Sequence, residues 1–157
     1  MRESMRESMN GTWIDVAGPD HLDRLAQLHA AYRVEDGLAP DDAVARGAIE
    51  PLLRDRSRGM ILIAGEDHDV LGYAVLTWGW GLESGGREGL LDEVYVVGER
   101  RGQGVGGQLV DRVIDAARGA HCRTLFLETE KANDGARRLY AQHGLGAQDS
   151  IWMSMEL

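Results

Sequence analysis

The sequence predicts a single α/β domain in which helices flank a mixed, mainly antiparallel β-sheet. Its 157 residues suit one domain with a substantial core and are too few for two ordinary domains. Segments with the spacing of strands and helices follow one another in the order strand, two helices, three strands, helix, strand, helix, strand. Two of the strands are separated only by residues 66–69, a polar connection of hairpin length, so we expect these two strands to pair antiparallel.

Residues 11–157 are assigned to this domain, and residues 1–10 to a frayed N-terminal end. That end contains the tetrapeptide Met-Arg-Glu-Ser twice and lacks the apolar stretch of a secretory signal. No apolar run in the sequence approaches the length that spans a membrane, so we expect no membrane partner.

The first third of the chain is expected to form a strand and two helices. Residues 12–17 alternate between apolar and polar side chains as a strand does, and Gly18-Pro19-Asp20 supplies a turn and a helix cap. Apolar residues keep helical spacing from Leu22 to Tyr32 and predict the first helix. A second helix begins after Pro40, and Pro51 is expected to kink it or split it in two.

The middle of the chain is expected to form three strands. Residues 60–65 and 70–79 are the two strands of the hairpin. Residues 79–89 are rich in glycine and polar side chains and are expected to form a flexible turn. Residues 90–97 are β-branched and aromatic enough to form the next strand.

The last third is expected to alternate helix and strand. Residues 105–117 carry apolar side chains at every fourth position, which predicts a helix, and residues 123–129 form a strand after it. Residues 133–143 form a short helix that Gly144 ends. A final strand is predicted from four alternating apolar residues: Ile151, Met153, Met155 and Leu157.

A glycine-rich turn spans residues 100–109 and reads Arg-Arg-Gly-Gln-Gly-Val-Gly-Gly-Gln-Leu. It lies between a predicted strand and a predicted helix, where the first helical N–H groups have no internal partner and the helix dipole is positive. Glycines also let the backbone approach an anion closely. This arrangement predicts a turn that binds phosphate or pyrophosphate.

The turn resembles the coenzyme A pyrophosphate loop of the GNAT superfamily of N-acetyltransferases. The matching residues are Arg101-x-x-Gly104-x-Gly106, and Val94-x-Val96 stands at the position of that family's cofactor-pairing strand. Gly98 stands where the family usually has proline.

The family's second signature is matched by Asn133-x-x-Ala136-x-x-Leu139-Tyr140-x-x-x-Gly144. Both motifs occur in the family's order and at its usual separation, and with the order of elements the resemblance covers the chain from about Thr12 to Leu157. Leu145, where the family often has phenylalanine, is a small departure.

The resemblance implies acetyl-CoA as cofactor and an N-acetyltransferase that uses no covalent enzyme intermediate. In the family, the asparagine of the second signature touches the cofactor, the tyrosine faces the departing thiolate, and a strand N–H near Val96 would bind the thioester carbonyl. The alternative for Tyr140 is a purely structural role, in which it packs on its short helix with the hydroxyl at the surface. The cofactor-binding residues that the resemblance implies are Val94, Tyr95, Val96, Arg101, Gly102, Gln103, Gly104, Val105, Gly106, Gly107, Asn133 and Tyr140.

Two other functions compete with this interpretation. Gly102-x-Gly104-x-x-Gly107 also satisfies the dinucleotide-binding fingerprint of nucleotide-dependent oxidoreductases, with Glu128 in the place of the ribose-binding acid. That fingerprint normally opens a long parallel sheet, whereas here two thirds of the chain precedes it. The second competitor is a non-catalytic acyl-CoA sensor that kept the turn and lost the acceptor chemistry.

Amide formation requires a base, because an alkylamine with a pKa near 10.4 is protonated at neutral pH and its deprotonation costs roughly 4 to 5 kcal/mol. Glu128 precedes Asn133 by the spacing at which ribosomal-protein N-terminal acetyltransferases of the family carry their proton acceptor. Glu93 and Asp92 compete with it, and since adjacent strand residues point to opposite faces, only one of these two should face the acceptor cleft. Glu128, Glu93 and a relay of water alone stay open as alternatives.

The acceptor is expected to be the amine of a small molecule or peptide, and a cationic one. In the family, the connection between the first two helices lines the acceptor side, and here it carries four carboxylates: Glu35, Asp36, Asp41 and Asp42. A polyamine, an aminoglycoside or an amino terminus would suit them. The formal net charge of -9 argues against a nucleic-acid partner.

Trp78 and Trp80 lie on one face of a predicted strand. They have three interpretations: packing at a sheet edge, a dimer contact, or a wall of the acceptor pocket. With the apolar residues of the last strand, they could form a homodimer contact.

The single cysteine, Cys122, excludes a disulfide within the chain and favours a reducing cytoplasm. No metal is expected, because the histidines lack metal-ligand spacing: His21, His29, His68, His121 and His143.

Overall fold

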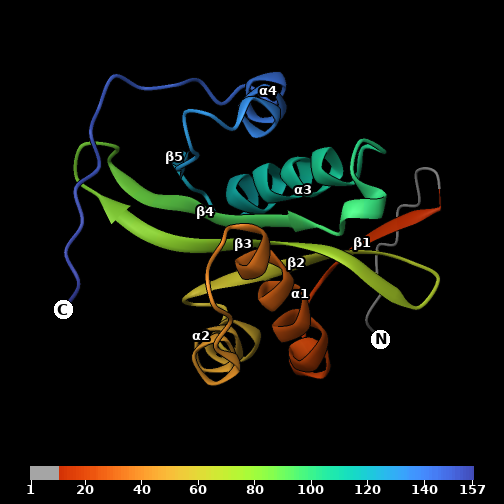
Figure 1. Cartoon of the computed structure of the whole chain (residues 1–157). Coiled ribbons are helices and arrows are strands. Elements are labelled where there is room, and N and C mark those ends of the chain that lie inside the picture. The colour runs from red at the N-terminus through yellow and green to blue at the C-terminus, as the bar shows by residue number, and fades with distance from the viewer. Residues whose placement is uncertain (1–10) are drawn as a thin grey trace.

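A five-stranded sheet in the order β1-β2-β3-β4-β5 forms the centre of the computed structural model, which describes residues 11–157 (Figure 1). Neighbours from β1 to β4 pair antiparallel, and β5 pairs parallel with β4. The predicted mixed, mainly antiparallel sheet is therefore confirmed, while the predicted frayed end lies outside the described residues. The strands are β1 (Thr12–Val16), β2 (Gly59–Glu66), β3 (Asp69–Gly81), β4 (Gly86–Val96) and β5 (Thr124–Leu127).

Helices cover both faces of the sheet (Figure 1). One face carries α1 (Leu22–Glu35) and α2 (Asp42–Arg54). The other carries α3 (Val105–Gly119), with α4 (Asp134–Gln142) packed against it. None of the described helices is long and apolar enough to cross a membrane.

The alternation of side chains along β2 divides the core into two clusters. Ile61 and Ile63 pack on the side of α1 and α2, whereas Leu62 and Ala64 pack on the side of α3. All four side chains are almost fully buried. A strand with helices on both faces thus reads as a continuous apolar run.

Pro51 does not split the second helix, contrary to one of the two outcomes expected from the sequence. The helix starts at its N-cap Asp41, whose side chain accepts a hydrogen bond from the N–H of Val44, and runs on to Arg54. Pro51 falls in the last turn, so little helix remains beyond the hydrogen bond that proline removes.

The glycine-rich segment 79–89 is not a flexible turn, and this expectation was wrong. β3 and β4 pair as far as Gly81 and Gly86, which leaves only four residues for the turn. Gly89 is the partner of Trp78 across the strands, and a Cβ atom there would come within 3.0 Å of the Leu125 side chain. This glycine therefore permits close packing between strands and does not mark a loop.

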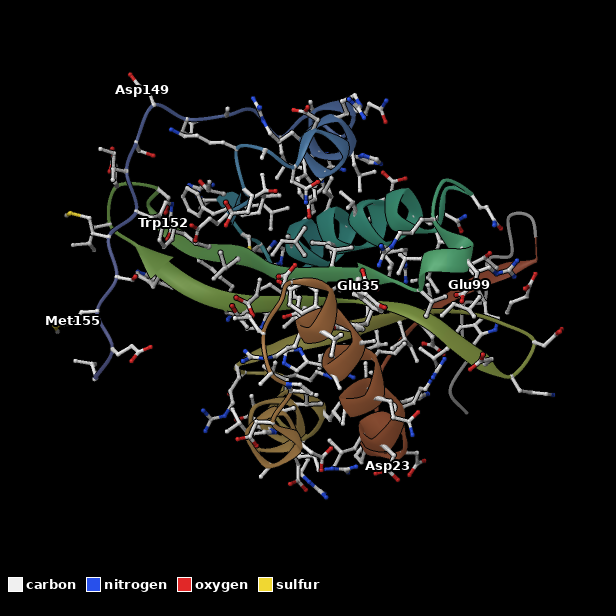
Figure 2. All side chains as sticks on the ribbon, in the orientation of Figure 1. Asp23, Glu35, Glu99, Asp149, Trp152 and Met155 are labelled. Atoms are coloured by element: carbon white, nitrogen blue, oxygen red, sulfur yellow. The ribbon has the colours of Figure 1, made fainter. Side chains whose placement is uncertain are left out.

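The predicted final strand does not form, and the strand predicted over residues 123–129 ends at Leu127. Residues 151–157 belong to no helix or strand, and Ile151 and Met153 are 88% and 90% exposed. Figure 2 labels Trp152 and Met155 on this segment, and Asp149 just before it. An alternating pattern indicates a chain that can be a strand, but a strand also needs the free edge of a neighbour.

Candidate functional site

The gap between β4 and β5 is the first feature of the site. The two strands pair only from Glu88 to Leu91 on β4, with Leu127 of β5 opposite Leu91, whereas β4 continues to Val96. Within the described part of the chain no strand pairs with residues 92–96 on the β5 side. Because the N–H of Val97 bonds the carbonyl of Leu71 on β3, the backbone groups of Val94 and Val96 point to the open edge, where they can bond an extended ligand as a strand would.

A β-bulge lies where the gap begins. Val75 of β3 pairs with Glu93 and Leu76 pairs with Leu91, so Asp92 is an extra residue in β4. The bulge resets the alternation of side chains. Asp92 and Glu93 consequently line the same cavity, and the expectation that only one of them could face the cleft was wrong.

The cavity lies between α1, α2 and the sheet and has a volume of about 90 Å³. Its walls are mostly apolar, and its polar side chains gather near the bulge. Those polar side chains are His29, Tyr73, Asp92 and Glu93.

Glu93 is the best-enclosed carboxylate of this cavity, with a side chain only 14% exposed. Its Oε1 accepts a hydrogen bond from the hydroxyl of Tyr73 and lies 3.0 Å from Nδ1 of His29 on α1. Burial, followed by the charge of Glu93, raises the pKa of Tyr73, so this phenol stays a donor.

Sequence reasoning overlooked His29, which had been considered only as a metal ligand. The signal was its spacing: His29 follows the buried Leu25 by four residues and so lies on the inner face of α1. A histidine on that face, opposite a strand with a carboxylate, could have been recognised as a candidate partner of Glu93.

Glu128 lies elsewhere. It is the first residue after β5, it is exposed, and it is not among the residues that line the cavity. Because Leu127 pairs with Leu91, Glu128 stands across the gap from Asp92. The structure thus brings Glu93, and not Glu128, into the cavity.

The glycine-rich turn lies at the N-terminus of α3. Gly102 and Gly104 have φ angles of +74° and +87°, and a Cβ atom on either would meet nothing within 4 Å. These two glycines are therefore required by backbone conformation and not by lack of space. Val105 follows as the first helical residue and is buried in the core, while Gln103 in the exposed turn bonds the backbone carbonyl of Glu99.

The next two glycines meet a different requirement. A Cβ atom on Gly106 would lie 3.5 Å from the Leu139 side chain, and one on Gly107 would lie 3.6 Å from the ring of His143. Both partners belong to α4 or its C-cap. The small residues at the start of α3 therefore let α4 pack closely beside the turn.

Arg101 joins the turn to β4 and α1. Its Nε donates to the carbonyl of Val96 at 2.8 Å, its Nη2 donates to Oε2 of Glu35 at 2.5 Å, and the guanidinium lies over the ring of Tyr95. The hydroxyl of Tyr95 donates to the other oxygen of Glu35 at 2.9 Å. Arg101 is the main cause that lowers the pKa of Glu35, whose place at the end of α1 beside the sheet is labelled in Figure 2.

The acidic connection after α1 is largely neutralised by internal partners. Glu35 is paired with Arg101, Asp41 caps α2, and the Asp42 carboxylate is 2.7 Å from Nε of Arg46. Asp36 shares a side-chain hydrogen bond with Tyr32, so all four carboxylates expected to attract a cationic acceptor have internal partners.

The residues of the second signature lie at α4. Asn133 is exposed and caps the helix, its Oδ1 accepting from the N–H of Ala136 at 3.0 Å. Tyr140 is partly buried and packs against the core cluster beneath α3. Burial raises its pKa, so the phenol holds its proton at neutral pH.

The tryptophans of β3 do not line the cavity. The indole N–H of Trp78 donates to the carbonyl of Arg56, and the Arg87 guanidinium lies 5.7 Å from its ring centre. Trp78 therefore packs against neighbouring segments of the fold. Trp80 is 72% exposed.

The arrangement fits coenzyme A and argues against a dinucleotide. A turn of free N–H groups at the start of α3 suits a pyrophosphate, and the open edge of β4 suits an extended amide chain beside it. A doubly wound dinucleotide-binding sheet is mainly parallel, whereas β4 and β5 form the one parallel pair among the described strands.

Comparison with known proteins agrees with this geometry. The model of the acetyltransferase (GNAT) family matches residues 22–145. A Bacillus subtilis (strain 168) protein named as an uncharacterized N-acetyltransferase, YhfO, is 32% identical over 118 residues, which cover 75% of this chain and 76% of that protein.

Solved structures share the fold. The ribosomal-protein-alanine N-acetyltransferase of Brucella melitensis biovar Abortus 2308 has a TM-score of 0.73 and 26% identity, covering 92% of this chain and 99% of that one. A predicted acetyltransferase of Clostridium acetobutylicum, solved with acetyl-CoA, has a TM-score of 0.78 at 18% identity, covering 92% and 96%.

Proposed function

We propose, since this chain belongs to the acetyltransferase (GNAT) family, that it transfers an acetyl group from acetyl-CoA directly to a primary amine of a small molecule or peptide. One observation carries the proposal. The edge of β4 opens at Asp92, leads to the glycine-rich turn in one direction, and lies beside the partly buried carboxylate of Glu93.

The cofactor would be held along β4 and at the start of α3. N–H groups of residues 102–107 would bind the pyrophosphate, and backbone groups of Val94 and Val96 would bond the pantetheine chain. Arg101 fixes the start of the turn through its hydrogen bond to the carbonyl of Val96. The side-chain amide nitrogen of Asn133 is a further donor at the start of α4. When bound, acetyl-CoA supplies the activated acetyl group as a thioester.

Different residues of this chain would accept the proton of the amine and donate a proton to the leaving sulfur. Glu93 would receive the amine proton, directly or through a neighbour, and its place in the cavity favours it over Glu128 and over a relay of water alone. A backbone N–H near Val96 would stabilise negative charge on the acetyl oxygen. Tyr140, which burial keeps protonated, would give its proton to the leaving sulfur.

We also infer a homodimer. Large apolar side chains are exposed at two places, the end of β3 with the turn after it and the C-terminal segment, and exposed apolar surface of this kind marks contacts between proteins. The residues are Trp80, Leu82, Ile151, Trp152, Met153, Met155 and Leu157. A reaction that consumes acetyl-CoA, together with a single free cysteine, favours a cytoplasmic location, and the net charge of -9 leaves nucleic acid an unsuitable partner.

A binding and turnover experiment tests the function. Acetyl-CoA should raise the melting temperature while NAD does not, and thiol should be released from acetyl-CoA when amines from a panel of polyamines, aminoglycosides, amino acids and peptides are added. Stabilisation by NAD alone would contradict the proposal. Stabilisation by acetyl-CoA without thiol release from any amine would point to a sensor.

A pair of glycine variants locates the cofactor. Gly104→Ala forces a residue with a Cβ atom into a left-handed conformation, a strain of about 1 to 2 kcal/mol in the turn, and should weaken acetyl-CoA binding. Gly98→Ala is the matched control, because Gly98 has no such φ and a Cβ atom there meets nothing within 4 Å. Equal loss of affinity in both variants would show that the turn is not the binding site.

A further inference from the structure

The cavity between α1, α2 and the sheet has the properties of a pocket for an amine with an apolar substituent. Its wall comes from three directions: α1, α2 and the strands. The larger side chains of the apolar wall are Leu25, Ile49, Leu52, Ile61 and Val75, and Ala45 and Ala48 of α2 complete it.

Charge is confined to one end of this cavity. The carboxylates that line it are Asp92 and Glu93, which the bulge in β4 turns to the same side at the point where β4 and β5 separate. An ammonium group placed at that end lies next to the gap, while anything attached to it extends toward α2. A polycation would instead meet an apolar wall, which leaves its further charges without partners.

The pair of His29 and Glu93 can take a proton at the charged end. Glu93 already accepts a hydrogen bond from Tyr73, so its carboxylate is held in place and can accept a second bond from Nδ1–H of His29 at 3.0 Å. That bond fixes the tautomer in which Nε2 of His29 carries a free lone pair. A carboxylate that orients a histidine is a common arrangement for a general base.

We propose that this cavity is the acceptor pocket, that it takes a primary amine carried on a short apolar chain, and that His29, oriented by Glu93, removes the proton of that amine. The inference rests on the proposed acetyl transfer and deepens it by naming the class of acceptor. A cavity of ~150 Å³ holds the six carbon atoms of benzene. In the same proportion, the volume of about 90 Å³ accommodates roughly four carbon atoms.

Nε2 of His29 takes one proton from the ammonium group, and the lone pair set free on nitrogen forms the bond to the acetyl carbon while the carbon–sulfur bond breaks. Tyr140 gives its proton to the leaving sulfur, and the second proton lost by nitrogen returns to Tyr140 through solvent. The products are an acetamide, the coenzyme thiol and one proton, which His29 passes to water.

A series of linear amines from methylamine to hexylamine tests the class of acceptor. Each methylene that enters the pocket should raise kcat/KM about fourfold, and the increase should stop after about four carbons. Binding of pentylamine to the enzyme loaded with coenzyme A should also show a negative heat-capacity change in calorimetry, a readout without turnover.

Two alanines of α2 provide a matched pair of variants. Ala45→Val fills the pocket and should lower kcat/KM for pentylamine about tenfold while affecting methylamine little. Ala43→Val makes the same change on the exposed face of α2 and should leave both amines unchanged. Turnover of polyamines or aminoglycosides in preference to linear amines would overturn the inference and leave acetyl transfer intact. Absence of thiol release with every amine would overturn both.

The role of His29 has its own test. His29→Gln keeps a group that can bond Glu93 but cannot take the proton, so kcat should fall about a hundredfold and the loss of activity toward acid should disappear from the pH profile. The titratable groups that face His29 are Glu93 and Asp92 from β4 and Tyr73 from β3, with Tyr32 beside it on α1; α2 contributes only apolar side chains to the cavity. An unchanged pH profile would show that His29 is not the base.

Discussion

At the scale of single residues, burial decides which side chains keep their protons. Tyr140 and Tyr73 both have raised pKa values because burial disfavours the phenolate. The pKa of Tyr32, on α1 beside the cavity, rises to about 12, first through burial, then through its bond with Asp36 and the charge of Glu93. Phenols at this site therefore act as donors at neutral pH.

Tyr140→Phe removes the hydroxyl that we propose as the proton donor and keeps the ring that packs against the core. We expect kcat to fall about a hundredfold, because a general acid contributes on this order, while the affinity for acetyl-CoA changes little. Stopped-flow or steady-state kinetics at saturating substrates, with calorimetry of acetyl-CoA binding, measure the two effects. Unchanged turnover would leave Tyr140 as a packing residue only.

Two carboxylate variants distinguish the candidate bases. Glu93→Gln should lower kcat about a hundredfold, because it removes the charge that orients His29, whereas Glu128→Gln should stay within about twofold of the parent enzyme. The pH dependence of kcat with a linear amine is the measurement. The opposite ranking of the two variants would make Glu128 the base and place the reacting amine across the gap.

At the scale of elements, contacts between the ends of helices and strands set the geometry of the site. The bulge at Asp92 turns two carboxylates to one face of β4, and Arg101 connects the glycine-rich turn to the end of α1. Neither contact follows from the pattern of a single element. Each joins segments that lie far apart in the sequence.

The ion pair between Glu35 and Arg101 should give stability that depends on pH. Arg101, and then Tyr95, hold the pKa of Glu35 below its ordinary 4.5. A carboxyl group with a lowered pKa in the folded state stabilises the protein above its unfolded pKa, and this contribution is lost as the pH falls through the lower, folded value. The contribution is therefore complete at pH 7 and declines below pH 4.5.

Glu35→Gln tests this expectation by urea unfolding at pH 7 and in steps down to pH 3. The variant should be less stable than the parent at pH 7, and the difference should shrink toward acid. Glu83→Gln, which removes the same charge from the exposed β3–β4 turn, is the control and should show no such trend. A difference that stays constant with pH would mean that the carboxylate contributes little.

At the scale of the whole molecule, residues 151–157 form the longest run of exposed apolar side chains within the described part of the chain. The apolar side chains of this C-terminal segment alternate and are exposed, and β5 beside the gap is a strand of only four residues with Phe126 38% exposed. A second copy can cover both surfaces, which is the basis of the inferred homodimer.

Removing residues 151–157 should convert this dimer into a monomer with little loss of melting temperature, because the segment contributes nothing to the buried core. Light scattering coupled to size exclusion measures the mass of both forms. The mass of the Leu82→Ser variant, measured in the same way, tests whether the second exposed surface, at the β3–β4 turn, also belongs to the dimer contact. A full-length chain that is monomeric at high concentration would contradict the inferred contact.

The sequence by itself determined the order of elements as far as α4, the bounds of most of these helices and strands to within a few residues, and the location of the glycine-rich turn. These features depend on local periodicity, on glycines that adopt positive φ, and on two motifs of fixed spacing. The family follows from the same residues, since Arg101, Gly104 and Asn133 occupy their positions in the motifs at the start of α3 and α4.

Only the tertiary structure decided which side chains meet. The bulge that turns Asp92 and Glu93 to one face arises from pairing with β3, and the approach of His29 depends on how α1 packs on the sheet. From the sequence, the acidic connection after α1 was expected to attract a cationic acceptor, but in the structure its carboxylates have partners within the chain. Residues 151–157 have the alternating pattern of a strand, but they pair with no strand edge. Periodicity records the local conformation of a chain, whereas register, bulges and ion pairs depend on segments that are distant in sequence.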